Sequence, residues 1–329
     1  QGVSSAASDV YKRQILDNDG VKDEALTIAL DMTVQGERLT LDFSRTSPQC
    51  AGPVNISRAT AIAACYVALK HLFPDVPANA GVLDAVDFVL PEGLVISAAR
   101  PRPVGGYTET ILRMIDVIFS ATAQADPKRA MAQAYGTINA LSIAGLRTDA
   151  ARKGQRWVMF SFFGGGHGGH GDGDGLSHGN APISTATIPP LEILEAAYPV
   201  RFTQWALRPD SGGDGQHRGG LGAIYEIELL EQDAEVFIFG ERGKASPQGI
   251  SGGSAGSMNV FSYENDSEWK QPPMRSKMIG IRLKQGERVR LETPGGGGYG
   301  APAAREAAAR EKDLAMGYVS ANAATKGKA

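Results

Sequence analysis

The sequence predicts an α+β protein, with a mixed α/β part at residues 15–182 followed by a mainly antiparallel, β-rich part at 183–300. Two observations favour this class. Helical spacing of apolar residues is confined to the first part and the tail, apart from one short turn. The second part consists of short alternating runs separated by glycine, which is typical of a small antiparallel sandwich or barrel. We expect residues 301–329 to form a helix and then a disordered tail.

The first fourteen residues, Gln1 to Gln14, lack a starting Met and show no periodicity that continues into the following segment. They look like a translated adapter or assembly remnant, so we predict that residues 1–14 take no part in the fold.

In the first part, apolar residues alternate over 25–32 and 39–43, with a hairpin turn at Gln35-Gly36-Glu37. Residues 57–72 and 108–125 show helical spacing, and each segment ends at or shortly before a proline. Further strands are expected at 84–90 and 157–163.

After Pro189-Pro190 we expect one short helical turn and then strands only. Their predicted ranges are 200–207, 223–230, 235–240, 257–262, 278–283 and 288–292. The alanine-rich segment 303–316 predicts a solvated helix.

Glycine accounts for 41 of the 329 residues, and 26 of these lie in the four clusters 164–180, 212–222, 240–256 and 295–300. We interpret these clusters as tight backbone turns.

Charge and cysteine content exclude several classes of protein. The net charge of -3 provides no basic surface for nucleic acid or an anionic membrane, and no apolar run is long enough to span a bilayer. Cys50 and Cys65 form no metal-binding or disulfide pattern, which indicates a reducing, cytoplasmic location.

The segment 164–178 concentrates candidate functional side chains: His167, His170 and His178, with Asp172 and Asp174 between them. Imidazole and carboxylate together suit Zn, Mn or Fe, and histidine is the usual acid or base near neutral pH. The alternative is a mobile surface loop in which these are polar turn residues.

Other catalytic signatures are absent from the sequence. Gly164, Gly166 and Gly169 match GxGxxG, but the following residues are too glycine-rich to form the helix that a dinucleotide site needs. There is no GxxxxGK[ST] motif for ATP and no nucleophile elbow.

Four motifs in order resemble the hydantoinase B family over about residues 15 to 318. They are Asp42-Phe43-Ser44 with Gly52-Pro53-Val54-Asn55, Pro77-Ala78-Asn79-Ala80-Gly81, Arg208-Pro209-Asp210-Ser211-Gly212-Gly213 and Glu292-Thr293-Pro294-Gly295 with the glycines after it. That family includes the B-type subunits of ATP-dependent N-methylhydantoinases, one half of 5-oxoprolinases and subunits of acetone and acetophenone carboxylases.

The chain departs from the family at Arg45, where a glycine is common, and at His178-Gly179-Asn180, where many members have His-x-His-Met-Thr-Asn. The N-terminal motif associated with the family's metal site has no match. The chain therefore resembles the C-terminal part of such a subunit, and we expect it to be inactive alone.

The resemblance implies an ATP-dependent hydrolase that opens a hydantoin, 5-oxoproline or lactam ring. ATP and Mg would act on a hydantoinase A-type partner subunit, and a divalent metal would belong to the full-length B-type subunit. His178 and Asp174 become the best candidates for positioning water or supporting the metal. The alternatives are a subunit of an ATP-dependent ketone carboxylase and a non-catalytic assembly module.

Overall fold

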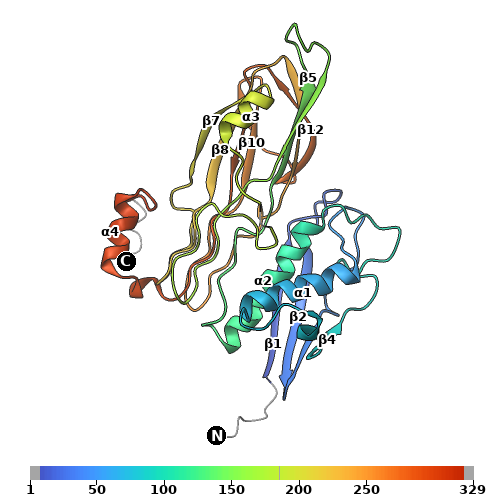
Figure 1. Ribbon diagram of the computed structural model, residues 1–329, viewed down its shortest axis with the longest axis vertical. Coiled ribbons are helices and arrows are strands. Elements are labelled where there is room, and N and C mark those ends of the chain that lie inside the picture. The colour runs from blue at the N-terminus through green and yellow to red at the C-terminus, as the bar shows by residue number, and fades with distance from the viewer. Residues whose placement is uncertain (1–7, 185, 322–329) are drawn as a thin grey trace.

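The computed structural model describes residues 8–184 and 186–321, and it confirms the α+β class. Its strands form three sheets, two of them stacked above and one lying below behind two helices (Figure 1). No helix in these ranges is long and apolar enough to cross a membrane.

The α/β lobe comprises a four-stranded sheet in the order β1-β2-β3-β4, with helix α2 packed against the sheet and helix α1 packed against α2. The element bounds are β1 Ser8–Leu16, β2 Leu26–Gln35, β3 Arg38–Asp42, α1 Arg58–Leu72, a 3-10 turn Ala80–Leu83, β4 Val86–Val89 and α2 Tyr107–Ala125. The predicted hairpin joins β2 to β3, with Gly36 at φ +60°. Ser57 caps α1 by accepting a hydrogen bond from the backbone N–H of Thr60 at 3.2 Å.

Part of the segment 1–14, which was predicted to take no part in the fold, is a strand of the sheet. Residues 8–14 form most of β1, which pairs antiparallel with β2 from Ser8 opposite Val34 to Leu16 opposite Leu26. Residues 1–7 lie outside the described residues, and the origin of the whole segment stays a prediction.

The second lobe is a β-sandwich whose two sheets have the orders β12-β9-β5-β6 and β11-β10-β13-β8-β7. Its elements are β5 Ala140–Leu146, β6 Arg156–Ser161, α3 Leu191–Ala197, β7 Val200–Leu207, β8 Ala223–Leu229, β9 Asp233–Phe239, β10 Val260–Asn265, β11 Glu268–Lys270, β12 Lys277–Lys284 and β13 Arg288–Glu292. A core of buried residues from both sheets lies between them.

The boundary expected at residues 182 and 183 does not separate the lobes. Strands β5 and β6 precede it, yet β5 pairs with β9 from the later part of the chain. The sandwich therefore starts at β5, near residue 140, because β5 is hydrogen-bonded into one of its sheets. Strand β5 has no predicted counterpart, because its Ala, Ser and Gly residues are weak strand formers.

The glycine clusters contain tight turns at 170–173 and 250–253, but most of each cluster is not a turn. Most of their residues form extended segments that run side by side below the sandwich (Figure 1). We call residues 164–179, 212–222, 249–256 and 295–300 the glycine bundle.

Three of these segments close a triangle of hydrogen bonds, an arrangement that a flat sheet cannot form. Gly166 N–H donates to Pro294 O at 3.0 Å, Gly296 N–H to Gly220 O at 2.9 Å, and Gly220 N–H to His167 O at 2.8 Å. A Cβ added at Gly166, Gly219 or Gly296 would lie 1.9 Å from a backbone oxygen of a neighbouring segment. Close backbone approach therefore requires glycine here, as it does at the axis of collagen.

The tail consists of a 3-10 turn Pro302–Ala304 and helix α4 Ala307–Ala315. This helix is not simply solvated, because Asp313 is buried and pairs with Arg218 at 3.3 Å and Arg305 at 2.7 Å. Residues 322–329, within the tail expected to be disordered, lie outside the described residues.

Candidate functional site

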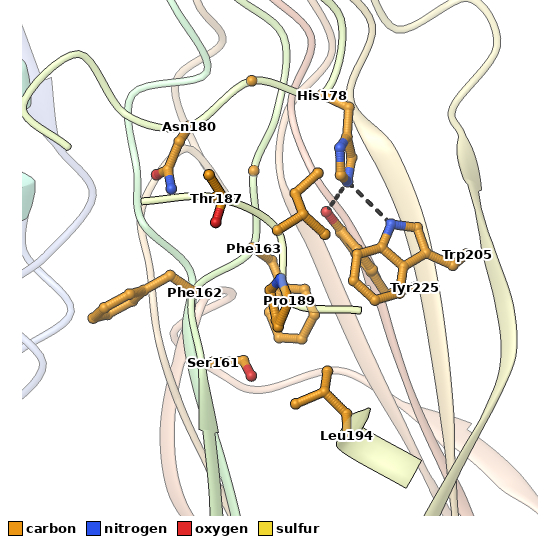
Figure 2. Close-up of a pocket in the computed structure, with 13 residues that line it drawn as sticks. Ser161, Phe162, Phe163, His178, Asn180, Thr187, Pro189, Leu194, Trp205 and Tyr225 are labelled. Carbon is orange, nitrogen blue, oxygen red and sulfur yellow. Dashed lines mark hydrogen bonds between the residues drawn. The ribbon is translucent and has the colours of Figure 1, made fainter. Parts of the chain in front are cut away.

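The candidate site is a small pocket where the glycine bundle meets strands β6, β7 and β8. It is lined by aromatic rings and by a few polar side chains (Figure 2). The lining residues are Ser161, Phe162, Phe163, Gly164, His178, Gly179, Asn180, Thr187, Ile188, Pro189, Leu194, Trp205 and Tyr225.

His178 points into this pocket from the glycine bundle, with its backbone in the left-handed region at φ 51°. Trp205 Nε1–H donates to His178 Nε2 at 3.1 Å, and the Tyr225 hydroxyl is hydrogen-bonded to the same nitrogen (Figure 2). Because an indole N–H can only donate, Nε2 is an acceptor and the proton of the neutral ring is on Nδ1.

Burial lowers the pKa of His178, which favours this neutral form. The lone pair on Nε2 is already engaged by two neighbours, so Nε2 is not available to take a proton from water. The arrangement instead presents a fixed imidazole whose Nδ1–H is a hydrogen-bond donor.

The space enclosed by the pocket is about 20 Å³, which accommodates about one water molecule. A hydantoin or lactam ring does not fit in this conformation. The pocket can therefore orient His178 and one small polar group, but it is not a complete substrate site.

Asp174 lies four residues from His178, but its side chain contacts different residues. Its carboxylate forms two hydrogen bonds with the Arg305 guanidinium, at 2.7 and 2.8 Å, and accepts the Arg218 backbone N–H at 2.7 Å. Burial opposes its ionisation, but the Arg305 guanidinium holds the pKa of Asp174 below its ordinary value. No hydrogen bond or ion pair within the described ranges joins Asp174 to His178.

The remaining predicted residues also have separate partners. His167 Nε2 donates to the Asn180 carbonyl oxygen at 2.6 Å, and burial lowers the pKa of His167. His170 Nδ1 accepts the Asp172 backbone N–H at 3.3 Å, and the Asp172 side chain is exposed.

The described residues contain no group of three or more His, Cys, Asp or Glu side chains that could hold a metal ion. The segment 164–178 therefore does not provide the metal site that its composition suggests. The rejection of the GxGxxG match agrees with the structure, since a tight turn and not a helix follows Gly169.

Sequence reasoning did not identify the aromatic partners of His178. Trp205 and Tyr225 lie 27 and 47 residues further along the chain, in strands whose alternation indicates only that they are strands. Neither spacing nor composition carries a signal for this contact.

Comparisons with known proteins agree with the resemblance. The family model described as Hydantoinase B/oxoprolinase matches residues 3–302. An uncharacterized protein of Methanocaldococcus jannaschii is 31% identical over 287 residues, which are 87% of this chain and 49% of that protein. A putative B-type subunit of a D-/L-hydantoinase from a Pseudomonas species is 26% identical over 92% of this chain and 52% of its own length. The chain thus spans about half the length of these relatives.

Two solved structures share the fold. Nucleotide-free acetone carboxylase matches with a TM-score of 0.81 and 19% identity, over 97% of this chain and 48% of its own. The ATP-dependent caprolactamase from Pseudomonas jessenii matches with a TM-score of 0.80 and 24% identity, over 97% of this chain and 56% of its own. The family model, which matches residues 3–302, shows that the chain belongs to the hydantoinase B/oxoprolinase family.

Proposed function

We propose that this chain is part of a B-type subunit of an ATP-dependent enzyme that hydrolyses a cyclic amide. The family match over residues 3–302 carries the proposal. The relative named as a hydantoinase component and the shared fold with a caprolactamase support this substrate class.

The chemistry of a cyclic amide explains why ATP would be needed. An amide carbonyl is a poor electrophile, and phosphorylation of an oxygen creates a good leaving group. The chain has no P-loop sequence, so we assign ATP and Mg to a hydantoinase A-type partner subunit. The divalent metal implied by the resemblance finds no ligand cluster among the described residues, and we derive no step through it.

Within this proposal His178 is a positioning residue. Its Nδ1–H can orient a water molecule or a polar group of the intermediate, while Trp205 and Tyr225 hold the ring in place. Asp174 acts at a distance from this pocket, as a brace between the glycine bundle and the tail.

We retain a cytoplasmic location as part of the proposal. Cys50 and Cys65 are both free thiols, which supports a reducing compartment.

A second candidate is a subunit of an ATP-dependent ketone carboxylase, which the shared fold with acetone carboxylase favours. The two reactions are separated by assaying the complex of this chain with an A-type subunit. We expect ATP turnover with hydantoin, 5-oxoproline or caprolactam in the absence of bicarbonate. ATP turnover that needs a ketone and bicarbonate would overturn the hydrolase.

The role of His178 is tested in the same complex with His178→Asn, because asparagine tolerates the left-handed backbone at this position. We expect kcat to fall at least about tenfold, in the range typical of a lost positioning contact. The exposed residue Asp172 provides the control, and Asp172→Asn should leave turnover unchanged. Unchanged turnover for His178→Asn would favour the non-catalytic assembly module.

A further inference from the structure

The joint between the two lobes is built from buried charged side chains. Helix α2, the residue after β1, the segment that follows β9 and strand β12 all contribute, and each of these charged residues is at most 5% exposed. The cluster contains four acids and three bases, namely Asp17, Glu109, Asp116, Glu241, Arg113, Arg242 and Lys277.

Two of the acids are paired with basic side chains. Asp116 on α2 pairs with Arg113 at 2.7 Å and with Arg242 of the sandwich at 2.6 Å. Glu241 pairs with Lys277 and accepts the Asp17 backbone N–H at 2.7 Å. The contacts of Asp116 with Arg242 and of Glu241 with Asp17 join residues more than 100 positions apart and hold the lobes together.

Asp17 is held by backbone groups rather than by a cation. Its carboxylate accepts the Gly243 N–H at 2.6 Å and the Lys244 N–H at 3.2 Å. These donors favour the ionised carboxylate, whereas burial and the like charge of Glu241 raise the pKa of Asp17.

Glu109, in the first turn of α2, has no comparable support. Its Oε1 accepts the Ile138 N–H at 3.1 Å, whereas its Oε2 is buried without a hydrogen-bond partner in the described structure. The hydroxyl of Tyr135 nearby is also buried and without a partner. A carboxylate with an unpartnered buried oxygen is costly, while a protonated carboxyl is not charged.

The charges that face Glu109 do not compensate for this. Glu241, in the segment after β9, repels a negative Glu109. Lys277 on β12 and Arg113 on α2 attract it but form their own ion pairs elsewhere. Asp17, Asp116 and Arg242 complete the surrounding charges, and four acids against three bases leave one negative charge in excess. One proton on the cluster therefore restores neutrality.

We propose that Glu109 carries this proton and is the titratable element of the joint, so that its protonated form seals the two lobes together and its ionised form loosens them. Burial raises the pKa of Glu109 to about 7, and the like charge of Glu241 adds to this increase.

The loosening would reach the candidate site through the segment 133–139. Ile138 donates to Glu109, and Tyr135 in the same segment donates its backbone N–H to Gly166 O at 2.7 Å. The Tyr135 side chain also lies against Gly165 of the glycine bundle. Ionisation of Glu109 thus acts on the segment that connects the joint to the bundle carrying His178.

The sign of the pH dependence follows from the direction of the shift. The pKa of Glu109 is higher in the folded state than its ordinary value of 4.5, so its ionisation at higher pH disfavours the folded state. The free energy of unfolding therefore falls as the pH rises from about 4.5 to about 7, and it stays at the lower level at higher pH.

The test compares thermal unfolding of the 329-residue chain and its Glu109→Gln variant between pH 5 and pH 9. Glutamine keeps the acceptor for Ile138 N–H and cannot ionise. We expect the variant to melt roughly 5 °C above the wild type at pH 8, with a difference that shrinks toward pH 5. A difference that is absent at pH 8, or the same at all pH values, would overturn the proposal.

Glu241→Gln is the matched control, because it makes the same chemical change at an acid that is paired. It should melt below the wild type at every pH, since it leaves Lys277 buried without its partner.

A measurement on the wild type does not depend on whether either variant folds. The infrared band of a protonated carboxyl group should be present at pH 6 and disappear as the pH rises through about 7. Its absence at pH 6 would show that Glu109 is ionised and would contradict the proposal.

Discussion

A single nitrogen atom determines what His178 can do. Two donors converge on Nε2, so the ring is locked by Trp205 and Tyr225 rather than by a carboxylate (Figure 2). In the usual acid-base arrangement a carboxylate accepts the Nδ1–H and leaves Nε2 free. Here Nε2 is the engaged nitrogen and no carboxylate accepts from the ring, which favours positioning over proton abstraction.

Tyr225→Phe removes one of the two donors and keeps the aromatic packing. We expect the free energy of unfolding to fall by about 1 kcal/mol, the typical net value of a hydrogen bond. The pKa of His178 should rise, because the neutral ring loses a partner, and an NMR titration of the imidazole would detect it. Tyr66→Phe is the control, since the Tyr66 hydroxyl makes no hydrogen bond within the described ranges, and it should change neither quantity.

At the scale of an element, helix α4 is held by ion pairs rather than by an apolar face. Arg305 connects Asp174 of the glycine bundle to Asp313 of the helix, and Arg218 reinforces Asp313 from the other side. The Arg305 side chain is only 9% exposed, so these pairs are poorly screened by solvent.

Arg305→Ala should therefore release α4 while the rest of the fold remains. We expect cleavage within residues 303–316 to become roughly tenfold faster in limited proteolysis, which corresponds to about 1.4 kcal/mol of docking free energy. Lys312→Ala, on an exposed position of the same helix, should leave the cleavage rate at the wild-type level. Equal rates for the two variants would mean that Arg305 does not anchor the helix.

At the scale of the whole molecule, the glycine bundle extends below the sandwich toward helix α4 (Figure 1). Its segments come from four separate stretches of the chain, and their backbones are in direct contact. A side chain at one position therefore displaces several segments at once.

Gly219→Ala places a Cβ 1.9 Å from the Gly296 carbonyl oxygen, which neither backbone can accommodate without moving. We expect a loss of about 3 kcal/mol or more in the free energy of unfolding, measured by urea denaturation. Gly105→Ala is the matched control, because no atom lies within 4 Å of its added Cβ. That variant should be as stable as the wild type or slightly more stable, since alanine restricts the unfolded chain.

Local patterns in the sequence determine most of the elements. Alternation predicts β2, β3 and the strands β7 to β10, and helical spacing with terminal prolines predicts α1 and α2 close to their observed bounds. Period and turn chemistry are properties of neighbouring residues, so they can be recognised without knowledge of the fold.

Contacts between distant segments are decided only in the tertiary structure. From the sequence, Glu109 is interpreted as an acidic residue in the first turn of a helix. In the folded protein the docked sandwich buries its side chain completely. The sequence also groups His178 with Asp174, whereas folding directs one toward Trp205 and Tyr225 and the other toward Arg305. Glycine content identifies where the backbone is unusual, and only the packing shows that the reason is close approach between segments rather than turning.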